Sequence, residues 1–390
     1  MAKSANALIK PDLLEWTRKD AGFGVEEAAR KIGTTPERLA GWEQGDSKPT
    51  VNQLRKLAAA YKRPLALFYL PVPPEDTPAI RDFRRLPGTI FGSDSPQLRF
   101  EKRRAQFRRD TALELFPLIE HDPPEFPIMA SLSDDPELIG VQIRDTLGIT
   151  YADQVRRSRQ RTSFNYWREA IEEIGVLVFQ MWLVDNQEAR GFSYSGSQYP
   201  VIALNSKDSL AGRTFTLLHE LAHLTLREGG LCDLLEERQN PSLEGQTEIF
   251  CNAVAGATLV PRDYLLLESS VSSNAGSKWA DDEIFDLAAK FGVSRETLLR
   301  RLLICGKTTA DFYAIKRSEY LAEPAPSQRF PVPYRYRVIN RSGRSFTKLI
   351  LENYLRDNIT GSDVAEYLEV QLKHLPDIER EVMGSATSIT

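Results

Sequence analysis

The spacing of hydrophobic residues changes several times along the chain, and each change predicts a different kind of element. From Pro11 to about Leu70, hydrophobic residues recur at helical spacing in short blocks. Turn signals separate these blocks, among them Gly33-Thr-Thr-Pro36 and Gly45-Asp-Ser-Lys-Pro49. This part of the chain is therefore predicted to form a compact helical domain. The proline-rich segment 71–78 that follows is typical of a semi-rigid linker.

Farther along the chain, helical and strand-like patterns alternate. Between residues 98 and 119, apolar residues recur at helical spacing among many arginines, which predicts a long amphipathic helix with a solvated basic face. Three short apolar runs bounded by turn residues predict a small sheet, and they lie at 176–179, 191–194 and 201–204. Helical patterns precede and follow these runs. The predicted fold class is α+β: an all-α domain, then a domain with a small sheet and a helical C-terminal region.

Composition narrows the class of protein. The chain has 390 residues, of which 42 % are hydrophobic and 27 % charged, as in soluble globular chains with two or three domains. Its net charge of -4 argues against binding nucleic acid along the whole length, although one small domain can still bind it. Three widely spaced cysteines indicate a reducing compartment. Because no signal peptide or apolar span is visible, we expect a cytoplasmic protein without a membrane partner.

The segment His219-Glu-Leu-Ala-His223 carries the chemistry. Residues four apart lie on one face of a helix, so both imidazoles can bind one metal ion. Glu220 is offset by one residue, where its carboxylate can serve as a general base beside the metal. Two neutral imidazoles and one carboxylate suit Zn²⁺ with an open fourth position. The alternative is a buried helix with hydrogen-bonded histidines, but polar groups on so apolar a helix need a partner, which a metal supplies.

The third ligand is less clearly specified. A metzincin would need Gly and His at positions 226 and 229, where Leu226 and Gly229 stand, so that class is excluded. Carboxylates from the following segment are the candidates, and they are Glu228, Asp233, Glu236, Glu237, Glu244 and Glu248. We favour Glu248, because small residues after it (Ala253, Ala255, Gly256 and Ala257) would let its helix approach the helix of the two histidines.

These motifs resemble the ImmA/IrrE family of gluzincin-like metallopeptidases. The matching positions are Arg213, Phe215, Thr216, His219, Glu220, His223, Glu248, Asn252 and Pro261. The resemblance implies a zincin-like peptidase domain in which His219, His223 and Glu248 hold zinc and Glu220 is the catalytic base. It also implies a protein substrate, because members of this family cleave helix-turn-helix repressors. Cys251 departs from the commoner alanine and is expected to be a packing residue.

Two residues near the motif are candidates for substrate contact. Asn205 ends the strand before the active helix, where zincins align the substrate backbone. A turn residue that ends a strand is an equal alternative for this position. Tyr194 is a candidate for stabilising an oxyanion.

The N-terminal helical domain resembles the XRE (lambda-repressor-like) helix-turn-helix. The resemblance rests on Trp42-Glu43, Gly45 and Pro49-Thr50. It implies that the helix from Thr35 to Gln44 lies in the major groove of a DNA operator. Candidate base contacts are Thr35, Glu37 and Arg38, and candidate phosphate contacts are Lys48 and Asn52. Glu37 and Glu43 place negative charge near the expected DNA.

Four segments and two hypotheses follow. We expect a helix-turn-helix domain at 1–70, a linker and long helix at 71–130, a zincin-like metallopeptidase domain at 131–310 and a helical region at 311–390. The leading hypothesis is a zinc endopeptidase that cleaves a repressor or another regulatory protein, with a homodimer as one form that binds DNA. The alternative is a DNA-binding or antitoxin-like regulator, with a toxin-like partner, whose peptidase fold serves for sensing or partner binding. A retained Glu220 favours the enzyme, because a structural zinc site needs no base.

Overall fold

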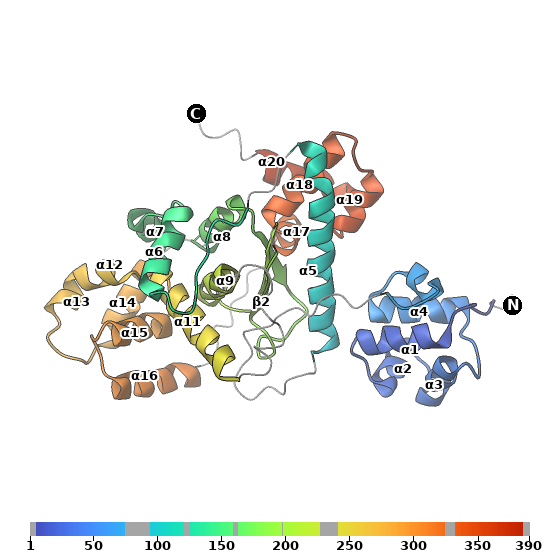
Figure 1. Cartoon of the computed structure of the whole chain (residues 1–390), viewed down its shortest axis with the longest axis horizontal. Coiled ribbons are helices and arrows are strands. Elements are labelled where there is room, and N and C mark those ends of the chain that lie inside the picture. The colour runs from blue at the N-terminus through green and yellow to red at the C-terminus, as the bar shows by residue number, and fades with distance from the viewer. Residues whose placement is uncertain are drawn as a thin grey trace. The chain divides into compact units, whose positions relative to one another are not determined.

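The computed structural model describes residues 5–74, 94–120, 125–158, 163–196, 198–226, 241–323 and 332–384. These residues divide into two compact units, one that ends at Gln106 and one that continues from Phe107 (Figure 1). Within the described ranges, none of the helices combines the length and hydrophobicity that a membrane-spanning helix needs.

The first unit contains short helices packed around one apolar core. They are α1 (Pro11–Asp20), α2 (Val25–Ile32), α3 (Pro36–Gln44), α4 (Val51–Tyr61) and the 3-10 helix η1 (Leu65–Tyr69). Apolar residues at helical spacing fill this core, among them Leu14, Leu39, Leu54 and Phe68, and each of these four has no exposed surface. The compact helical domain predicted for this region is therefore present.

Capping residues in the sequence explain where these helices begin and end. Gly33 ends α2 in the left-handed conformation with φ of 72°. The side chain of Thr35 accepts a hydrogen bond from the backbone N–H of Arg38 and begins α3. Thr50 and Gln53 form a reciprocal capping box at the start of α4. The tight turn between α2 and α3 is thus encoded locally.

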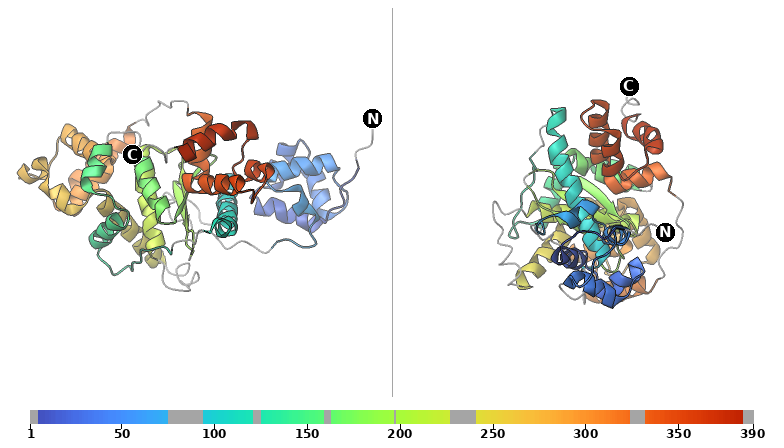
Figure 2. Two further views of the ribbon diagram at one scale, coloured as in Figure 1. Left: turned by 90° about the horizontal axis from the view of Figure 1, so that it is seen from above. Right: turned by 90° about the vertical axis from the view of Figure 1, so that its right-hand side faces the viewer.

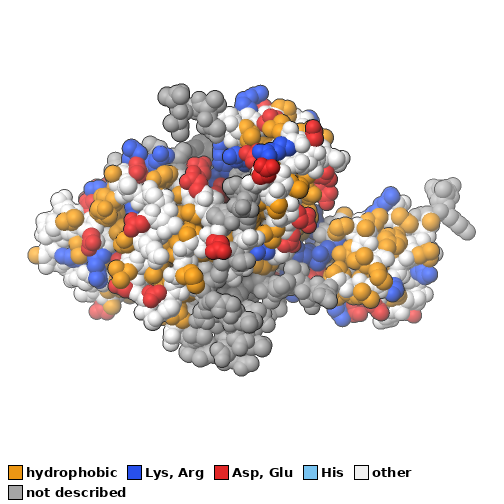
Figure 3. Space-filling model, turned by 45° about the horizontal axis from the view of Figure 1, so that its top comes forward, with side chains coloured by type: hydrophobic (Ala, Val, Ile, Leu, Met, Phe, Trp, Pro, Cys, Tyr) orange, Lys and Arg blue, Asp and Glu red, His pale blue; other side chains and the backbone are white. Residues whose placement is uncertain are grey.

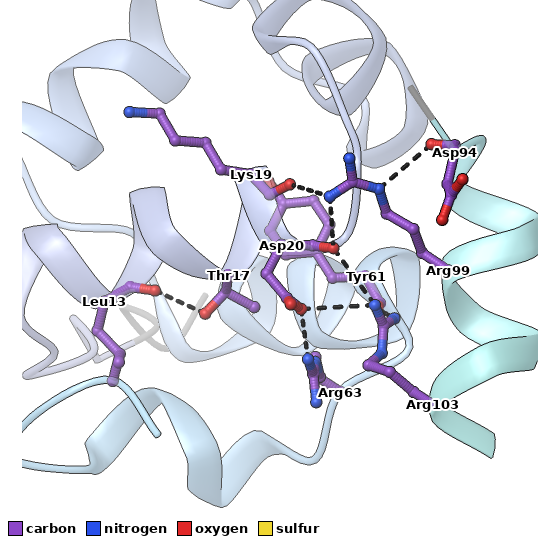
Figure 4. A network of polar contacts seen from close by, with 9 residues as sticks. All are labelled: Leu13, Thr17, Lys19, Asp20, Tyr61, Arg63, Asp94, Arg99 and Arg103. Atoms are coloured by element: carbon purple, nitrogen blue, oxygen red, sulfur yellow. Dashed lines mark hydrogen bonds and ion pairs between the residues drawn. The ribbon is translucent and has the colours of Figure 1, made fainter. Parts of the chain in front are cut away.

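The first half of α5 (Pro96–Leu115) completes this unit through arginine side chains (Figure 4). Arg99 donates to two main-chain carbonyls at the end of α1. Arg103 donates to the carbonyl oxygen of Tyr61 at the end of α4 and to the carboxylate of Asp20. Cationic side chains at helix C-termini satisfy carbonyls that lack an intrahelical partner. The arginines of α5 therefore hold this helix to the ends of two others.

The prediction of a solvated basic face for α5 was wrong. Arg104 and Arg108 are only 6 % and 2 % exposed. Arg108 lies in the second unit and donates to the carbonyl oxygen of Arg341 and to Oγ of Ser342. The acceptors of Arg108 are remote in sequence, so residue spacing along α5 does not reveal them, whereas Arg104 donates to Glu101 in the same helix.

In the described part of the chain, the second unit is built on a mixed sheet of three strands. They are β1 (Leu177–Met181), β2 (Gly191–Tyr194) and β3 (Val201–Asn205), and β3 lies in the middle. β1 runs parallel to β3, and β2 runs antiparallel to it. The three predicted apolar runs therefore form the predicted small sheet. β2 is an edge strand, and its register places Gly191 opposite Leu204.

Helices cover both faces of this sheet (Figures 1 and 2). α8 (Ser163–Glu173) and α9 (Leu210–Thr225) pack on one face, while α17 (Tyr334–Ser342) and α18 (Arg344–Leu355) pack on the other. Neighbouring residues of β1 show the alternation, since Gln180 contacts α9 and Phe179 meets a ring of α18. The C-terminal helices therefore form part of the packing around the sheet.

The remaining helices extend the core on the side of α9. They are α6 (Pro136–Thr146), α7 (Tyr151–Ser158), α11 (Pro241–Leu259), α12 (Arg262–Leu267), α13 (Ser269–Ser273), α14 (Asp281–Phe291), α15 (Arg295–Ile304) and α16 (Ala310–Ala322). The other short elements are η2 (Pro117–Ile119), α19 (Gly361–Tyr367), η3 (Leu372–His374) and α20 (Leu375–Met383). The chain turns between α14 and α15 at Gly292 with φ of 70°, and both helices support the apolar core through residues such as Ile284 and Leu298.

Helix α11 packs against both α9 and α6. We expected its small residues to face α9, but two of them face other elements. A Cβ on Gly140 of α6 would lie 3.0 Å from Cβ of Ala257, and a Cβ on Gly256 would lie 3.2 Å from Cδ of Arg301. These small residues let α6 and a long side chain of α15 approach α11 closely.

Candidate metal centre

Helix α9 places the histidine motif in the interior of the second unit. Ser209 begins this helix by accepting a hydrogen bond from the backbone N–H of Gly212. Most residues from Thr214 to Thr225 are buried, including His219 and Glu220, which have no exposed surface. His223 is 8 % exposed. The polar residues of the motif therefore lie in a largely dry environment, where their charge and hydrogen bonding must be compensated.

Three side chains converge on one point. Nε2 of His219 lies 3.1 Å from Nε2 of His223. The carboxylate of Glu248, from α11, lies 3.1 Å from Nε2 of His223 and 3.6 Å from Nε2 of His219. One ligand atom from each residue lies within 4.8 Å of the others. The packing of α11 on α9 thus brings a carboxylate from a later helix to the two imidazoles.

The separations fit a tetrahedral zinc site. Bonds of about 2.0–2.1 Å to a tetrahedral ion place its ligand atoms roughly 3.3 Å apart. The two imidazole nitrogens lie 3.1 Å apart, and they lie 3.1 and 3.6 Å from the two oxygens of Glu248, close to this value. Two imidazole nitrogens and one carboxylate are also a donor set that Zn²⁺ prefers. The side chain of Glu248 is 27 % exposed, so the group is open to solvent on that side.

Glu220 points from α9 toward the edge strand β2. A Cβ on Gly191 would lie 3.3 Å from Oε1 of Glu220, which places this carboxylate directly beneath the strand. Glu220 is not among the three residues whose ligand atoms converge. Glu220 directly follows His219 in α9, and its role as a general base remains a prediction.

The five candidate DNA contacts lie in the first unit. Thr35, Glu37, Arg38, Lys48 and Asn52 are all exposed, and they surround the start of α3 and the turn before α4. The guanidinium of Arg38 lies 5.8 Å from the ring centroid of Trp42, which is itself buried and belongs to the core.

Figure 3 shows another feature of this unit, a face on which hydrophobic side chains cover much of the surface.

One expectation about charge in this domain was wrong. Glu43 was expected to place negative charge near the DNA, but its side chain is only 6 % exposed and both carboxylate oxygens accept hydrogen bonds from Arg18 of α1 at 2.8 Å. This bidentate pair neutralises the carboxylate and joins α1 to α3. Glu37 remains an exposed acidic residue in the first turn of α3.

Two family models match the chain in the places that these sites occupy. The model of the IrrE N-terminal-like domain, a peptidase family, matches residues 171–303. A helix-turn-helix model matches residues 14–68. The chain carries an IrrE-like peptidase domain behind a helix-turn-helix domain. No curated protein matches the chain. The family resemblances drawn from the sequence are thereby confirmed, and the matched peptidase segment includes all three converging side chains.

Asn205 of the peptidase domain is fully buried and holds loops together. Its side-chain amide donates to the carbonyl oxygens of Val184 and Ala189, at 3.3 and 2.8 Å. Its side-chain oxygen accepts from the backbone N–H of Lys207 at 3.0 Å. These contacts favour the alternative that Asn205 is a strand-ending turn residue over a direct substrate contact.

Tyr194 ends the edge strand β2 and is partly buried. Burial raises the pKa of its phenol, and Asp110 raises it further while Arg109 lowers it. The hydroxyl is therefore protonated at neutral pH and able to donate a hydrogen bond, as oxyanion stabilisation would require. This role for Tyr194 remains a prediction.

The remaining candidates near the site are Cys251 and the alternative third ligands. Cys251 has no exposed surface and belongs to the apolar core, as expected of a packing residue. Of the alternative third ligands, Glu228, Asp233, Glu236 and Glu237 lie outside the described residues, and the side chain of Glu244 is likewise not described.

Sequence reasoning missed the contact between Gly191 and the histidine helix. The sequence marks this position only as the start of the apolar run 191–194. A glycine at the start of an apolar run that precedes such a motif does carry a signal, because glycine within a strand marks a close approach of other atoms. Identification of Glu220 as the group approached required the register of β2 and its packing on α9.

Proposed function

We propose that this protein is a zinc-dependent endopeptidase that cleaves a repressor or another regulatory protein to control transcription. The observation that supports the proposal most is the convergence of His219, His223 and Glu248, with ligand atoms within 4.8 Å and Glu220 buried beside them. The match to a peptidase family supports a peptidase activity for this domain, and the donor set suits zinc. When bound, zinc would act as a Lewis acid at the fourth position of this site.

The residues of the chain have distinct parts in this proposal. His219, His223 and Glu248 would hold the ion. Glu220 would accept a proton from the attacking water and pass it to the leaving amine. Burial of Glu220 keeps bulk water away from this carboxylate, so the proton is transferred within the site.

The helix-turn-helix domain gives the peptidase a place of action. We infer that the exposed start of α3 reads bases through Thr35, Glu37 and Arg38, while Lys48 and Asn52 contact phosphates. A domain of this size binds DNA tightly when two copies occupy a palindromic site, so we expect a homodimer on the operator. Peptidase activity near the operator would then act on a regulator that binds there.

The test is proteolysis of a candidate helix-turn-helix repressor by the wild-type protein and by Glu220→Gln. The glutamine retains the size of the side chain but cannot accept a proton from water, so turnover should fall by at least about a hundredfold. His374→Ala is a suitable control, because His374 lies against Tyr334 at the surface of the C-terminal helices. Equal regulatory output from wild type and Glu220→Gln in cells would overturn the peptidase mechanism. Such a result would favour an antitoxin-like regulator with a sensing or toxin-binding role.

A further inference from the structure

Two arginines of the second unit share one aromatic ring on the side of the sheet covered by α8 and α9. The Cζ atom of Arg168, in α8, lies 5.9 Å from the ring centroid of Phe164. The Cζ atom of Arg213, in α9, lies 5.2 Å from the same centroid. Phe164 is 2 % exposed, so the ring is a fixed part of the core. These three residues, with Gln180 of β1, are called the arginine cluster below.

The two guanidinium groups of the arginine cluster use few of their hydrogen-bond donors. Each guanidinium carries five N–H donors. Nη1 of Arg168 donates to Oδ1 of Asn340, and Nη1 of Arg213 donates to Oε1 of Gln180. Nε of each arginine is buried without an acceptor in the described part of the chain, and so is Nε2 of Gln180. Three buried donors therefore lack a partner, an arrangement that is unfavourable in a folded protein.

Charge is also uncompensated in the cluster. Among the described residues, no carboxylate forms an ion pair with Arg168, which is 2 % exposed, or with Arg213. Burial lowers the pKa of Arg213 most, and Asp208 raises it while Arg168 lowers it. Arg168 thus adds a like charge to the surroundings of Arg213, and a buried charge without a partner destabilises the folded chain.

The nearest carboxylates do not remove this excess. Glu172 lies one turn after Arg168 and accepts a hydrogen bond from the backbone N–H of Arg344. Burial raises the pKa of Glu172 to about 7, so this carboxyl is only partly charged at neutral pH. Asp208 accepts from the backbone N–H of Ser209 at the start of α9. An anion from solution would complete the cluster.

We propose that the arginine cluster is a binding site for a phosphate group, held by Arg168, Arg213 and Gln180. Guanidinium forks match the oxygens of phosphate, and a dianion would balance two positive charges. Partial exposure of Arg213 gives the group a route from solvent. The phosphate belongs either to inorganic phosphate or to a phosphate monoester, which share this chemistry.

The site lies apart from the candidate metal centre on the same helix. Arg213 precedes His219 by six residues, or about 9 Å along the axis of α9. Binding would therefore stabilise the first turns of α9 without requiring a metal ion. The proposal does not depend on peptidase activity, and it can be tested on the intact chain whether or not that activity is found.

Calorimetric titration of the full-length protein with inorganic phosphate and, separately, with ribose 5-phosphate tests the proposal. We expect saturable binding of at least one of the two compounds at one site per chain. Comparison of their affinities shows whether the site prefers inorganic phosphate or a phosphate monoester. Arg213→Gln should lower the affinity at least about tenfold, and Arg213→Lys should lower it less because the charge is retained. Acetate at the same concentrations should bind more weakly.

Two matched variants separate the cluster from other anion sites. His223→Ala removes an expected zinc ligand, so phosphate binding that persists in this variant does not occur at the metal. Arg380→Gln removes an exposed arginine whose side chain is 78 % accessible, and it should bind phosphate as the wild type does. Circular dichroism establishes that each variant is folded. The proposal is wrong if neither phosphate compound binds, or if the folded Arg213 variants bind with wild-type affinity, or if acetate binds as tightly as phosphate.

Discussion

Gly191 of β2 lies where any side chain would meet the carboxylate of Glu220 in α9. A Cβ on Gly191 would lie 3.3 Å from Oε1 of Glu220 and 2.6 Å from Cγ2 of Thr216. The second separation is too short for a real contact between heavy atoms that are not bonded. The lack of a side chain at position 191 therefore allows the edge strand to lie against the proposed catalytic base, and it fixes the space that this carboxylate occupies.

Replacement of Gly191 by alanine should impair catalysis more than metal binding. The added methyl group forces Thr216 or the strand to move, and a shift of the base by a fraction of an ångström should lower turnover by about ten- to a hundredfold. Zinc content should stay near that of the wild type, because the three atoms nearest this methyl group belong to Thr216, Ala203 and Glu220, none of which is a proposed ligand. Gly245→Ala, where an added Cβ meets nothing within 4 Å, is the matched control. Equal loss of turnover in both variants would contradict a positioning role.

The metal itself gives a second prediction. Purified wild-type protein should contain about one zinc ion per chain, and His223→Ala should lose most of it, because one of three protein ligands is removed. Glu248→Gln should weaken binding, since a neutral amide replaces a charged ligand. Elemental analysis measures both effects, and His374→Ala should keep its zinc. Absence of any first-row metal from wild-type protein prepared without chelators would contradict the proposed centre.

The parts of the structure that the sequence predicted well depend on short-range signals. The helix around His219 and the turn at Gly33 were identified because their spacing and capping residues are contained in about ten consecutive residues. The two histidines meet by helix geometry alone. Residue spacing favoured Glu248 among several carboxylates without singling it out, since its approach depends on the packing of α11 against α9.

The parts that escaped prediction depend on contacts between distant segments. Arg108 donates to the carbonyl oxygen of Arg341, 233 residues later in the chain. The inward turn of Glu43 depends on Arg18 in another helix. In the sheet, β3 lies between β1 and β2, whereas in sequence β2 lies between β1 and β3. Hydrophobic periodicity reports which face of an element is buried but not which element covers it, so these relationships could not be read from the chain.

DNA binding provides a third prediction. Lys48→Ala should weaken operator binding about equally on related sequences, and it should reduce the dependence of log affinity on log salt concentration by about one unit, because one phosphate contact is lost. Arg38→Ala should instead reduce discrimination between bases. Titrations of the intact protein at several salt concentrations distinguish the two effects. Lys348→Ala removes an exposed lysine of the second unit and should leave both quantities unchanged. No footprint by the intact protein at low salt would contradict an operator-binding role.

Glu172 predicts how stability depends on pH. This carboxyl is buried, and burial raises its pKa from 4.5 to about 7, although Arg168 and the backbone N–H of Arg344 lower it. The folded chain therefore holds the proton more tightly than the unfolded chain does. The resulting stabilisation is fully present below about pH 4.5 and is lost as the pH rises through 7.

The corresponding variant is Glu172→Gln, which keeps an oxygen that accepts the N–H of Arg344 but cannot ionise. Over the interval from pH 4.5 to 7, the wild type should lose up to roughly 3 kcal/mol of unfolding free energy from this group. The glutamine variant should lack that loss, so its advantage over the wild type should grow with pH. Urea denaturation at several pH values measures the difference. Parallel pH profiles for the two proteins would show that Glu172 is charged at neutral pH in the folded state, and Arg168 would then already have its counter-ion.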